Sequence, residues 1–306
     1  PGQILAIDTE TGQVLQSDDI DSRLKSRHPY KQWLRQSAMR IQASLDEDSG
    51  SASYDADQLK QYMKMFQVTF EERDQVLRPL AEQGQEAVGS MGDDTPMAVL
   101  SQRVRSIYDY FRQQFAQVTN PPIDPLRESI VMSLETCLGS EHNIFEETPG
   151  HANHLILSSP VISPAKWRTL MTLEREGFSR EFIELNYAQE LGLEAAIRAI
   201  ADQAEAAVRG GKVLLVLSDR NIGSGKLPAH PALAVGAVHH RLVEQGLRCN
   251  CNILVETATA RDPHHFAVLC GFGASVVYPY LAYEVLSDLV RNGEVLGDVH
   301  EVFKYY

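Results

Sequence analysis

The sequence predicts an α/β fold in which a mostly helical first half precedes five consecutive βα units. Residues 17–139 carry mainly helical signals, whereas from residue 155 onward short apolar runs alternate with helical stretches. The run Val-Leu-Leu-Val-Leu at 213–217 is apolar throughout, which is typical of a parallel strand covered on both faces. The pattern alone leaves two architectures open, a doubly wound sheet and part of a (β/α)₈ barrel.

The chain is predicted to begin with a β-hairpin. Residues 4–7 and 13–16 are short apolar strands, and the Gly-containing turn between them allows the chain to reverse. Ser17 and Asp18 then have the side chains that cap a helix start.

The remaining first half is predicted to be helical apart from loops. Residues 46–56 are acidic and serine-rich and are predicted to form a loop. Thr69 and Glu72 have capping-box spacing, in which the hydroxyl accepts from the third amide and the carboxylate reaches back. The predicted helices run over 17–24, 30–45, 57–66, 69–83, 97–100, 104–115 and 127–138.

The second half is predicted to repeat a strand followed by a helix. Its strands are expected at 155–157, 182–187, 213–217, 252–255 and 275–278, and its helices at 164–176, 192–208, 230–245, 263–270 and 281–291. We therefore divide the chain into a mostly helical connecting region, 1–145, and a βα-repeat region, 146–306.

Composition limits the class of partner. Apolar residues make up 43% of the chain and charged residues 23%, as in ordinary globular proteins. A net charge of −13 argues against nucleic acid as a partner, and no apolar run approaches the ~20 residues of a membrane span. The four cysteines fit a reducing cytoplasm better than a disulfide framework.

Residues of metal-binding type are present but poorly spaced for a metal. The adjacent pair His264–His265 would not share one helix face, and Cys249 and Cys251 lack a second cysteine pair. Cys137 is interpreted as a buried, inert thiol inside a helix, and Glu146–Glu147 as solvated surface. We expect no metal site and no catalytic residue in this chain.

One loop has features of an anion site. It lies at 218–228, after a predicted strand and before a helix, where sites gather in α/β proteins. Its glycines allow close backbone approach and its lysine offers a positive charge, but the spacing is not that of a P-loop. The favoured interpretation is a structural loop with Asp219 and Arg220 paired or capping, and an anion site is the alternative. The candidate anion-site residues are Asp219, Arg220, Asn221, Gly223, Gly225 and Lys226.

The stretch 114–128 contains three prolines, which predict a stiff, non-helical connector between helices. The simpler interpretation of such a cluster is that it only ends one helix before the next. Within and after it, Gln-Val-Thr-Asn-Pro-Pro-Ile-Asp-Pro-Leu-Arg-Glu at 117–128 and Val-Met-Ser-Leu at 131–134 resemble the central region of the large subunit of glutamate synthase. Further motifs of the same family are Gly-Ser-Met-Gly-Asp-Asp-Thr-Pro at 89–96 and Leu-Ser-Asp-Arg-Asn at 217–221. The resemblance extends from His-Pro-Tyr-Lys-Gln-Trp-Leu at 28–34 to Tyr-Pro-Tyr at 278–280.

The resemblance implies a role as well as a fold. It favours an incomplete (β/α) barrel, related to the FMN-binding barrel that follows in the family. Glutamate synthases make two L-glutamate from L-glutamine and 2-oxoglutarate with a reductant. An amidotransferase domain releases ammonia, and an FMN domain with an iron–sulfur cluster receives it through a tunnel. Both centres, and their cofactors, are expected outside this chain.

The resemblance also suggests partners and a path for ammonia. The expected partners are the flanking amidotransferase and FMN domains of the same polypeptide, together with a small reductase subunit. The proline-rich stretch offers stiffness and carbonyl groups, which suit a wall that keeps ammonia neutral. We expect Thr119, Asn120, Ile123 and Asp124 to lie at or near the tunnel or the interdomain contact.

The chain is interpreted as a fragment of a longer polypeptide, because it begins at Pro1 and its last residues carry no helix-ending or turn signal. We expect the segment to be inactive alone, as a non-catalytic central domain. Two alternatives remain: a free-standing small-molecule or phosphate-binding α/β enzyme that uses the 218–226 loop, and a pure interaction module.

Overall fold

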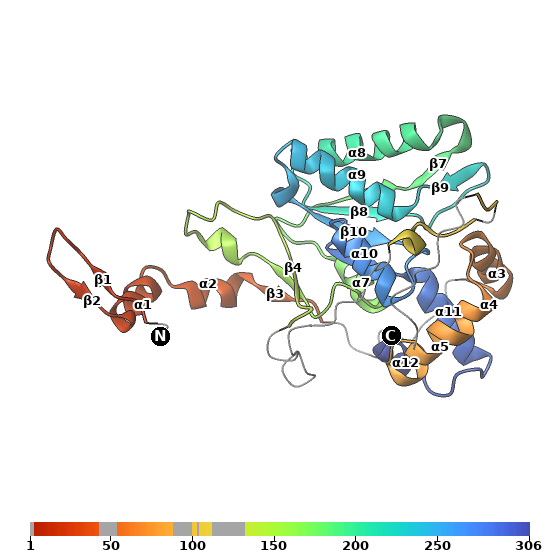
Figure 1. The fold of residues 1–306 in the computed structure, drawn as a ribbon, viewed down its shortest axis with the longest axis horizontal. Helices are drawn as coiled ribbons and strands as arrows, with labels where there is room; N and C mark the ends of the chain where they lie inside the picture. Colours follow the sequence, from red (N-terminus) through yellow and green to blue (C-terminus); the bar gives the residue numbers. More distant parts are fainter. Residues whose placement is uncertain (1–2, 43–53, 88–99, 103, 112–131) are drawn as a thin grey trace.

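The structure is a computed structural model that describes residues 3–42, 54–87, 100–102, 104–111 and 132–306. The proline-rich stretch at 114–128 therefore lies outside the described residues, as do most of the predicted loop at 46–56 and most of the predicted helix at 97–100. The molecule has a rounded body from which residues 3–38, here called the arm, project to one side (Figure 1).

A parallel sheet forms the centre of the body. Its strands are β6 (Arg180–Glu184), β8 (Leu214–Ser218), β10 (Asn252–Glu256) and β11 (Val276–Tyr278), in the spatial order β11-β10-β8-β6. All neighbouring pairs are parallel, and Val161 adds an isolated parallel bridge to Val277. Four of the predicted strands thus form one sheet in chain order.

The first predicted βα strand belongs to a different sheet. β5 (Leu155–Leu157) pairs in parallel with β3 (Met39–Arg40) and antiparallel with β4 (Thr136–Leu138). The prediction of five strands in one repeat was therefore wrong for the first strand. The reason is that β5 finds its partners in segments that precede it in the chain, which a repeat pattern does not reveal.

Helices cover both faces of the parallel sheet (Figure 1). On one face, Leu215 and Leu217 pack in a cluster with α8 (Leu193–Arg209), α9 (Pro231–Glu244) and α10 (Pro263–Gly271). On the other, Leu214 and Val216 pack with α7 (Pro164–Thr172), α11 (Tyr280–Arg291) and α3 (Ala56–Met65). Alternate side chains of β8 therefore enter opposite clusters, which confirms the prediction of a doubly covered strand.

The predicted helix at 69–83 is interrupted by a wider turn. It consists of α4 (Phe70–Glu72), a π-helical turn (Arg73–Leu77) and α5 (Arg78–Gln83). The amide of Arg78 bonds to the carbonyl of Arg73, five residues back, just before Pro79, which has no amide to donate. α5 packs beside α12 (Val299–Tyr305), a helix that Asp298 caps and that was not predicted.

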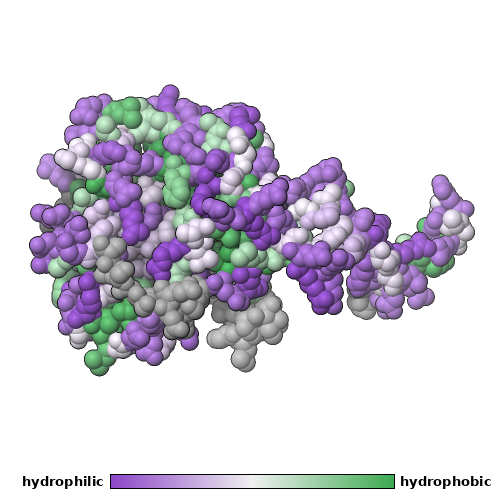
Figure 2. Space-filling model, turned by 180° about the vertical axis from the view of Figure 1, so that it is seen from behind, coloured by the Kyte–Doolittle hydropathy of each residue, from purple (hydrophilic) through white to green (hydrophobic). Residues whose placement is uncertain are grey.

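The arm contains the predicted hairpin, β1 (Ala6–Ile7) and β2 (Val14–Leu15), followed by α1 (Ser17–Ser26) and α2 (Tyr30–Ser37). The predicted second helix was too long: it ends at Ser37 because Met39 and Arg40 pair with β5 as a strand. Neither α1 nor α2 buries a side chain against the described residues. Figure 2 shows hydrophobic residues at the outer end of the arm.

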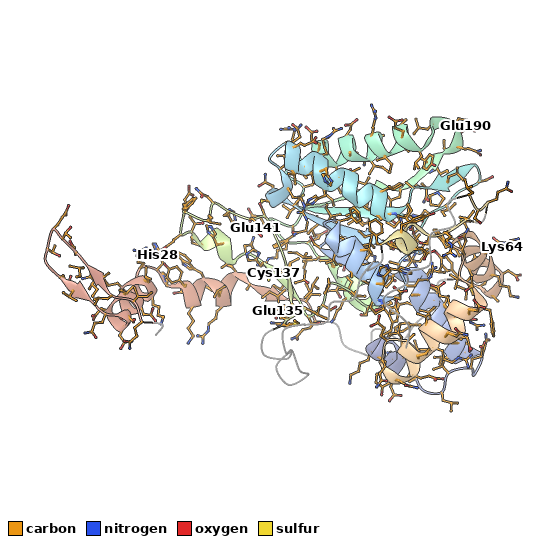
Figure 3. All side chains as sticks on the ribbon, in the orientation of Figure 1. His28, Lys64, Glu135, Cys137, Glu141 and Glu190 are labelled. Carbon is orange, nitrogen blue, oxygen red and sulfur yellow. The ribbon has the colours of Figure 1, made fainter. Side chains whose placement is uncertain are left out.

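Two further helix predictions in the first half were wrong where the structure describes them. At 104–111 the chain makes only a 3₁₀ turn, Ile107–Tyr110. The predicted helix at 127–138 ends in the strand β4, on which Cys137 is exposed rather than buried (Figure 3). In a strand, neighbouring side chains point to opposite sides, so burial of Leu138 exposes Cys137.

The second half otherwise follows the predicted element order closely. The predicted strand at 182–187 is divided by Leu185 into β6 and β7 (Asn186–Ala188). β7 pairs antiparallel with β9 (Lys226–Pro228), so part of the predicted 218–228 loop is itself a strand. This ribbon extends beyond the carboxyl ends of the parallel strands (Figure 1).

Candidate functional site

The carboxyl ends of the parallel strands meet at one edge of the sheet. Glu184, Ser218, Glu256 and Tyr278 are the last residues of their strands and lie in register. In open α/β sheets this edge is where ligands bind, so it is the first place to examine for chemistry.

At this edge Glu256 joins two neighbouring strands. Its carboxylate accepts from the Ser218 hydroxyl at 2.6 Å and from Nη1 of Arg220 at 2.9 Å. The Arg220 guanidinium lies 5.0 Å from the ring centre of Tyr280 and 6.0 Å from that of Tyr54. The Arg220 guanidinium is therefore held in place from two sides, by the aromatic faces and by the buried carboxylate of Glu256.

Helix α3 covers the same edge. The Tyr62 hydroxyl donates to the backbone carbonyl of Arg220 at 2.8 Å, and the Tyr62 ring stacks on Tyr54 with centroids 4.5 Å apart. Side chains from the first half of the chain therefore pack over the end of the sheet.

Asp219, next to Arg220 in the chain, is completely buried. Its carboxylate accepts from the Thr257 hydroxyl at 2.5 Å and from the Ala258 amide at 3.0 Å. Burial raises the pKa of Asp219 to about 7, although both hydrogen bonds act in the opposite direction. The carboxylate ties the ends of β8 and β10 together.

The residues of the predicted anion loop do not gather at one point. Lys226 begins β9, and its Nζ lies 3.0 and 3.1 Å from the two carboxylate oxygens of Glu184. Arg220 pairs with Glu256, so both cations of the loop contact carboxylates of this chain. Asn221, Gly223 and Gly225 are exposed, and Gly225 has a φ of 77°, which favours glycine. An anion site here stays a prediction.

Tyr108 anchors the first half of the chain at the same end of the sheet. It is fully buried, and its hydroxyl lies 3.1 Å from that of Thr259. Its ring lies 4.8 Å from His230 and 4.3 Å from His265. Burial lowers the pKa of His230 to about 4 and that of His265 to about 3, so both rings pack as neutral groups at pH 7.

A cleft of about 700 Å³ with a mixed polar and apolar lining lies beside this anchor. It is lined by residues of 104–109, by α4 and by the segment that follows β10, including Thr259, Arg261 and Asp262. The chain leads from the anchor into the proline-rich stretch. The predicted tunnel residues Thr119, Asn120, Ile123 and Asp124 lie outside the described residues, and their role stays a prediction.

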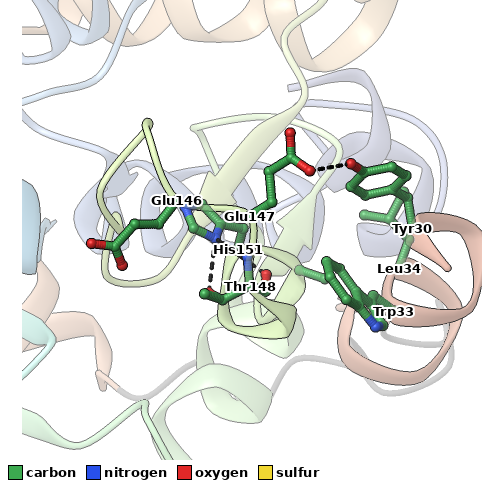
Figure 4. A pocket seen from close by; sticks show the side chains of 8 residues that line it. Tyr30, Trp33, Leu34, Glu146, Glu147, Thr148 and His151 are labelled. Atoms are coloured by element: carbon green, nitrogen blue, oxygen red, sulfur yellow. Dashed lines mark hydrogen bonds between the residues drawn. The ribbon is translucent and has the colours of Figure 1, made fainter. Parts of the chain in front are cut away.

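The arm and the body meet at a second site, which centres on Glu147 (Figure 4). The Tyr30 hydroxyl donates to Glu147 at 2.5 Å, and Arg27 and His28 lie 3.4 and 3.5 Å from the same carboxylate. This hydrogen bond from Tyr30 is the main cause that holds the pKa of Glu147 below its ordinary value. The interpretation of Glu147 as plain solvated surface was therefore incomplete.

A small, mostly apolar pocket of about 240 Å³ lies at this junction. Trp33 and Leu34 of α2 line one side and His151 and Ala152 the other. Figure 4 shows Glu147 turned toward Tyr30 and Glu146 turned away. The sequence did contain a signal for this contact. The aromatic residues of the 28–34 motif indicate a surface that packs against another part of the protein.

The described residues hold neither a metal cluster nor a membrane-spanning helix. In that part of the chain, no three or more His, Cys, Asp and Glu side chains converge as metal ligands would. No helix there is long and apolar enough to cross a bilayer.

The sequence was compared with known protein families. Residues 61–306 match the family described as glutamate synthase central domain, and residues 1–33 match class-II glutamine amidotransferases. The second match covers β1, β2 and α1 and ends inside α2.

Individual relatives match nearly the whole chain. It is 39% identical to a chloroplastic ferredoxin-dependent glutamate synthase of Oryza sativa subsp. japonica over 96% of its length, and 36% identical to the glutamate synthase (NADPH) large chain of Bacillus subtilis (strain 168) over 100%. A glutamate synthase (NADH) of Schizosaccharomyces pombe is 35% identical over 98% of the chain. The chain spans only 19%, 20% and 15% of these relatives, respectively.

Fold and comparisons together define a mixed α/β domain preceded by an arm of amidotransferase type. The chain belongs to the glutamate synthase family, and its residues 61–306 form the central domain of that family.

Proposed function

We propose that this chain joins the amidotransferase domain of a glutamate synthase to its FMN and iron–sulfur domain, without catalytic groups of its own. The whole enzyme would make two L-glutamate from L-glutamine and 2-oxoglutarate with a reductant. The observation that carries the proposal is the position of the amidotransferase match. It ends at residue 33, within the helix whose Tyr30 and Trp33 contact the body.

The carboxyl edge of the sheet supports a structural role. The charged groups there contact one another, as in the pairs Arg220–Glu256 and Lys226–Glu184, and Asp219 is engaged by Thr257 and Ala258. Tyr54 and Tyr62 then pack over the edge. An edge occupied by its own side chains favours a scaffold over the alternative of a small-molecule enzyme built on the 218–226 loop.

We further propose that the sheet is an incomplete barrel. The strands β6, β8, β10 and β11 are neighbours in chain order, as in a (β/α) barrel. Val161, which precedes β6 in the chain, pairs with β11 at the other end of the sheet. In a barrel the first strand pairs with both the second and the last. Here Val161 would be the first strand and pairs with the last, β11, so the ring would be open only between Val161 and β6.

The cofactors and remaining partners are proposed to lie elsewhere in the assembly. The FMN and the iron–sulfur cluster would lie in the following domain. The four cysteines here differ in burial, with Cys137 and Cys249 exposed and Cys251 buried, and they do not converge as cluster ligands. A small reductase subunit and a cytoplasmic location are also part of the proposal. The Oryza sativa relative, by contrast, is a chloroplastic protein.

Passage of ammonia is the function proposed for the proline-rich stretch. Desolvation favours neutral ammonia over ammonium, so a stiff wall that excludes water suits the transfer. The buried Tyr108 anchor supports this proposal because it holds the chain in place 11 residues before Thr119, the first of the four residues Thr119, Asn120, Ile123 and Asp124.

The test is a flexible Gly-Ser insertion between Ala38 and Met39 of the full-length enzyme, where the arm meets the body. We expect glutaminase and ammonia-dependent synthesis to persist while glutamine-dependent synthesis falls and free ammonia appears. The same insertion after Leu296, which is 90% exposed, serves as the control. Unchanged glutamine-dependent synthesis after the Ala38 insertion would refute the proposed joint.

A further inference from the structure

We propose that the loop at residues 141–148, here called the docking loop, is a binding surface for the amidotransferase domain of the same polypeptide. The inference rests on the proposed function and deepens it by naming the surface. Ile144 and Phe145 at the tip of the loop would be the apolar contact residues. The loop connects β4 with the 3₁₀ turn Pro149–Ala152 and lies beside α2 of the arm.

The tip exposes two apolar side chains in succession. Ile144 is 81% and Phe145 is 89% exposed. Large apolar side chains side by side on a surface are typical of contact sites for another protein domain. Single exposed residues need no such explanation, but an adjacent isoleucine and phenylalanine do.

The loop holds these side chains in an ordered turn. Asn143 organises it: its carbonyl accepts from the Glu146 amide at 2.9 Å, and its side chain accepts from the Phe145 amide at 3.1 Å. His151 reaches the same carbonyl with Nε2 at 3.0 Å. At the base, the Glu141 amide donates to the carbonyl of Cys249 at 2.8 Å. A preformed turn loses little conformational freedom on binding, which favours contact.

The contacts that the docking loop already makes indicate which domain would bind it. Glu147, two residues after Phe145, contacts Arg27, His28 and Tyr30, and these residues belong to the part that matches class-II amidotransferases. The contact between amidotransferase-type residues and the central region thus begins at the base of the loop. Ile144 and Phe145 stand three and two residues before Glu147 in the same loop, so they would extend that contact.

The arm offers a second apolar surface of the same kind. Ile4, Leu5, Ile7 and Val14, in and just before the β1–β2 hairpin, are more than half exposed. These residues also lie inside the amidotransferase match. The relatives have about four-fifths of their length outside the matched part, since the chain covers 15–20% of them, so a large domain is available to cover both surfaces.

The experiment places the photoreactive residue benzoylphenylalanine at position 145 of the full-length enzyme. After irradiation we expect an adduct within one polypeptide, mapped by mass spectrometry to the amidotransferase domain. The control carries the same residue at Leu296, which is equally exposed but lies between α11 and α12. That position is expected to give no amidotransferase adduct.

A second measurement uses the double variant Ile144→Ser with Phe145→Ser. We expect glutamine-dependent synthesis to fall about tenfold, as for the loss of a buried aromatic contact, while ammonia-dependent synthesis is retained. An adduct with the FMN domain or with another copy, or the absence of any adduct, would overturn the docking assignment. The proposed function itself would still hold after that result if the insertion between Ala38 and Met39 lowered glutamine-dependent synthesis while glutaminase activity persisted.

Discussion

Arg261 and Glu72 form a two-point ion pair, with Nε 2.6 Å from Oε1 and Nη2 3.0 Å from Oε2. The pair joins α4 to the segment that follows β10, and Arg261 is only 7% exposed. Nη1 of Arg261 also donates to the carbonyl of Ala258 at 2.8 Å. The pair therefore fixes the helical first half of the body on the carboxyl edge of the sheet.

Glu72→Gln should reduce the free energy of unfolding by about 3 kcal/mol, because it leaves the buried Arg261 without its countercharge. Urea-induced unfolding of the chain measures this change. Glu71→Gln is the matched control, since Glu71 is the exposed neighbour, and it should change stability by about 0.5 kcal/mol or less. Equal effects of the two substitutions would show that the ion pair is not a strong link.

Tyr108 provides a second test of how the first half is held. Tyr108→Ala should cost about 3–5 kcal/mol, as for other fully buried aromatic residues. Tyr108→Phe loses only the hydrogen bond to Thr259 and should cost about 1 kcal/mol. Tyr110→Ala, at a residue that is 57% exposed in the same turn, is the control. If Tyr108→Ala and Tyr110→Ala had similar effects in thermal or urea unfolding, the anchor would be refuted.

The raised pKa of Asp219 leads us to expect that the stability of the chain depends on pH. Its folded pKa of about 7 exceeds its ordinary value of 3.8, so the folded chain binds this proton more tightly than the unfolded chain. The stabilisation that protonated Asp219 gives to the folded state is fully present below about pH 4 and is lost as pH rises through 7. Over this range the free energy of unfolding falls by at most about 1.4 kcal/mol per pH unit. In Asp219→Asn this slope should disappear between pH 5 and 8. Parallel pH profiles of variant and wild type would contradict it.

Much of the second half was predictable because its local and tertiary signals agree. Pro164, Pro231 and Pro263 stand at the first position of their helices, and apolar runs mark the strands. The loop residue Asp219 was recognised as a candidate, with pairing as its alternative, but its complete burial could not be read from the motif. The groups that contact its carboxylate, the Thr257 hydroxyl and the Ala258 amide, lie 38 and 39 residues further along the chain.

The first half was harder to predict because distant contacts override local preference. The apolar pattern at 104–111 suggested a helix, yet Tyr108 inserts between His230 and His265 and the chain makes only a 3₁₀ turn. Thr69 accepts from the Glu72 amide as predicted. The Glu72 carboxylate, however, pairs with Arg261 and does not complete the capping box. The two departures from prediction, at Tyr108 and at the Glu72 carboxylate, each involve a partner more than 100 residues away in the chain.

The tunnel proposal predicts the effect of a larger side chain at position 123. In the full-length enzyme, Ile123→Trp should lower glutamine-dependent glutamate synthesis and leave glutaminase activity intact, because the indole would obstruct ammonia and not its release from glutamine. Both activities are measured on the same preparation, with Ile123→Val as the control for a change that adds no volume. If Ile123→Trp left both activities unchanged, Ile123 would not lie on the path.

The central claim is that this chain is a folded joint whose chemistry lies in neighbouring domains. Calorimetric titration of FMN, inorganic phosphate and 2-oxoglutarate into the chain of residues 1–306, with its thermal unfolding recorded alongside, tests it most directly. We predict a cooperative unfolding transition and no binding of any of the three. Saturable binding that is lost in Lys226→Ala would contradict the claim, because it would make the loop at 218–226 a working site.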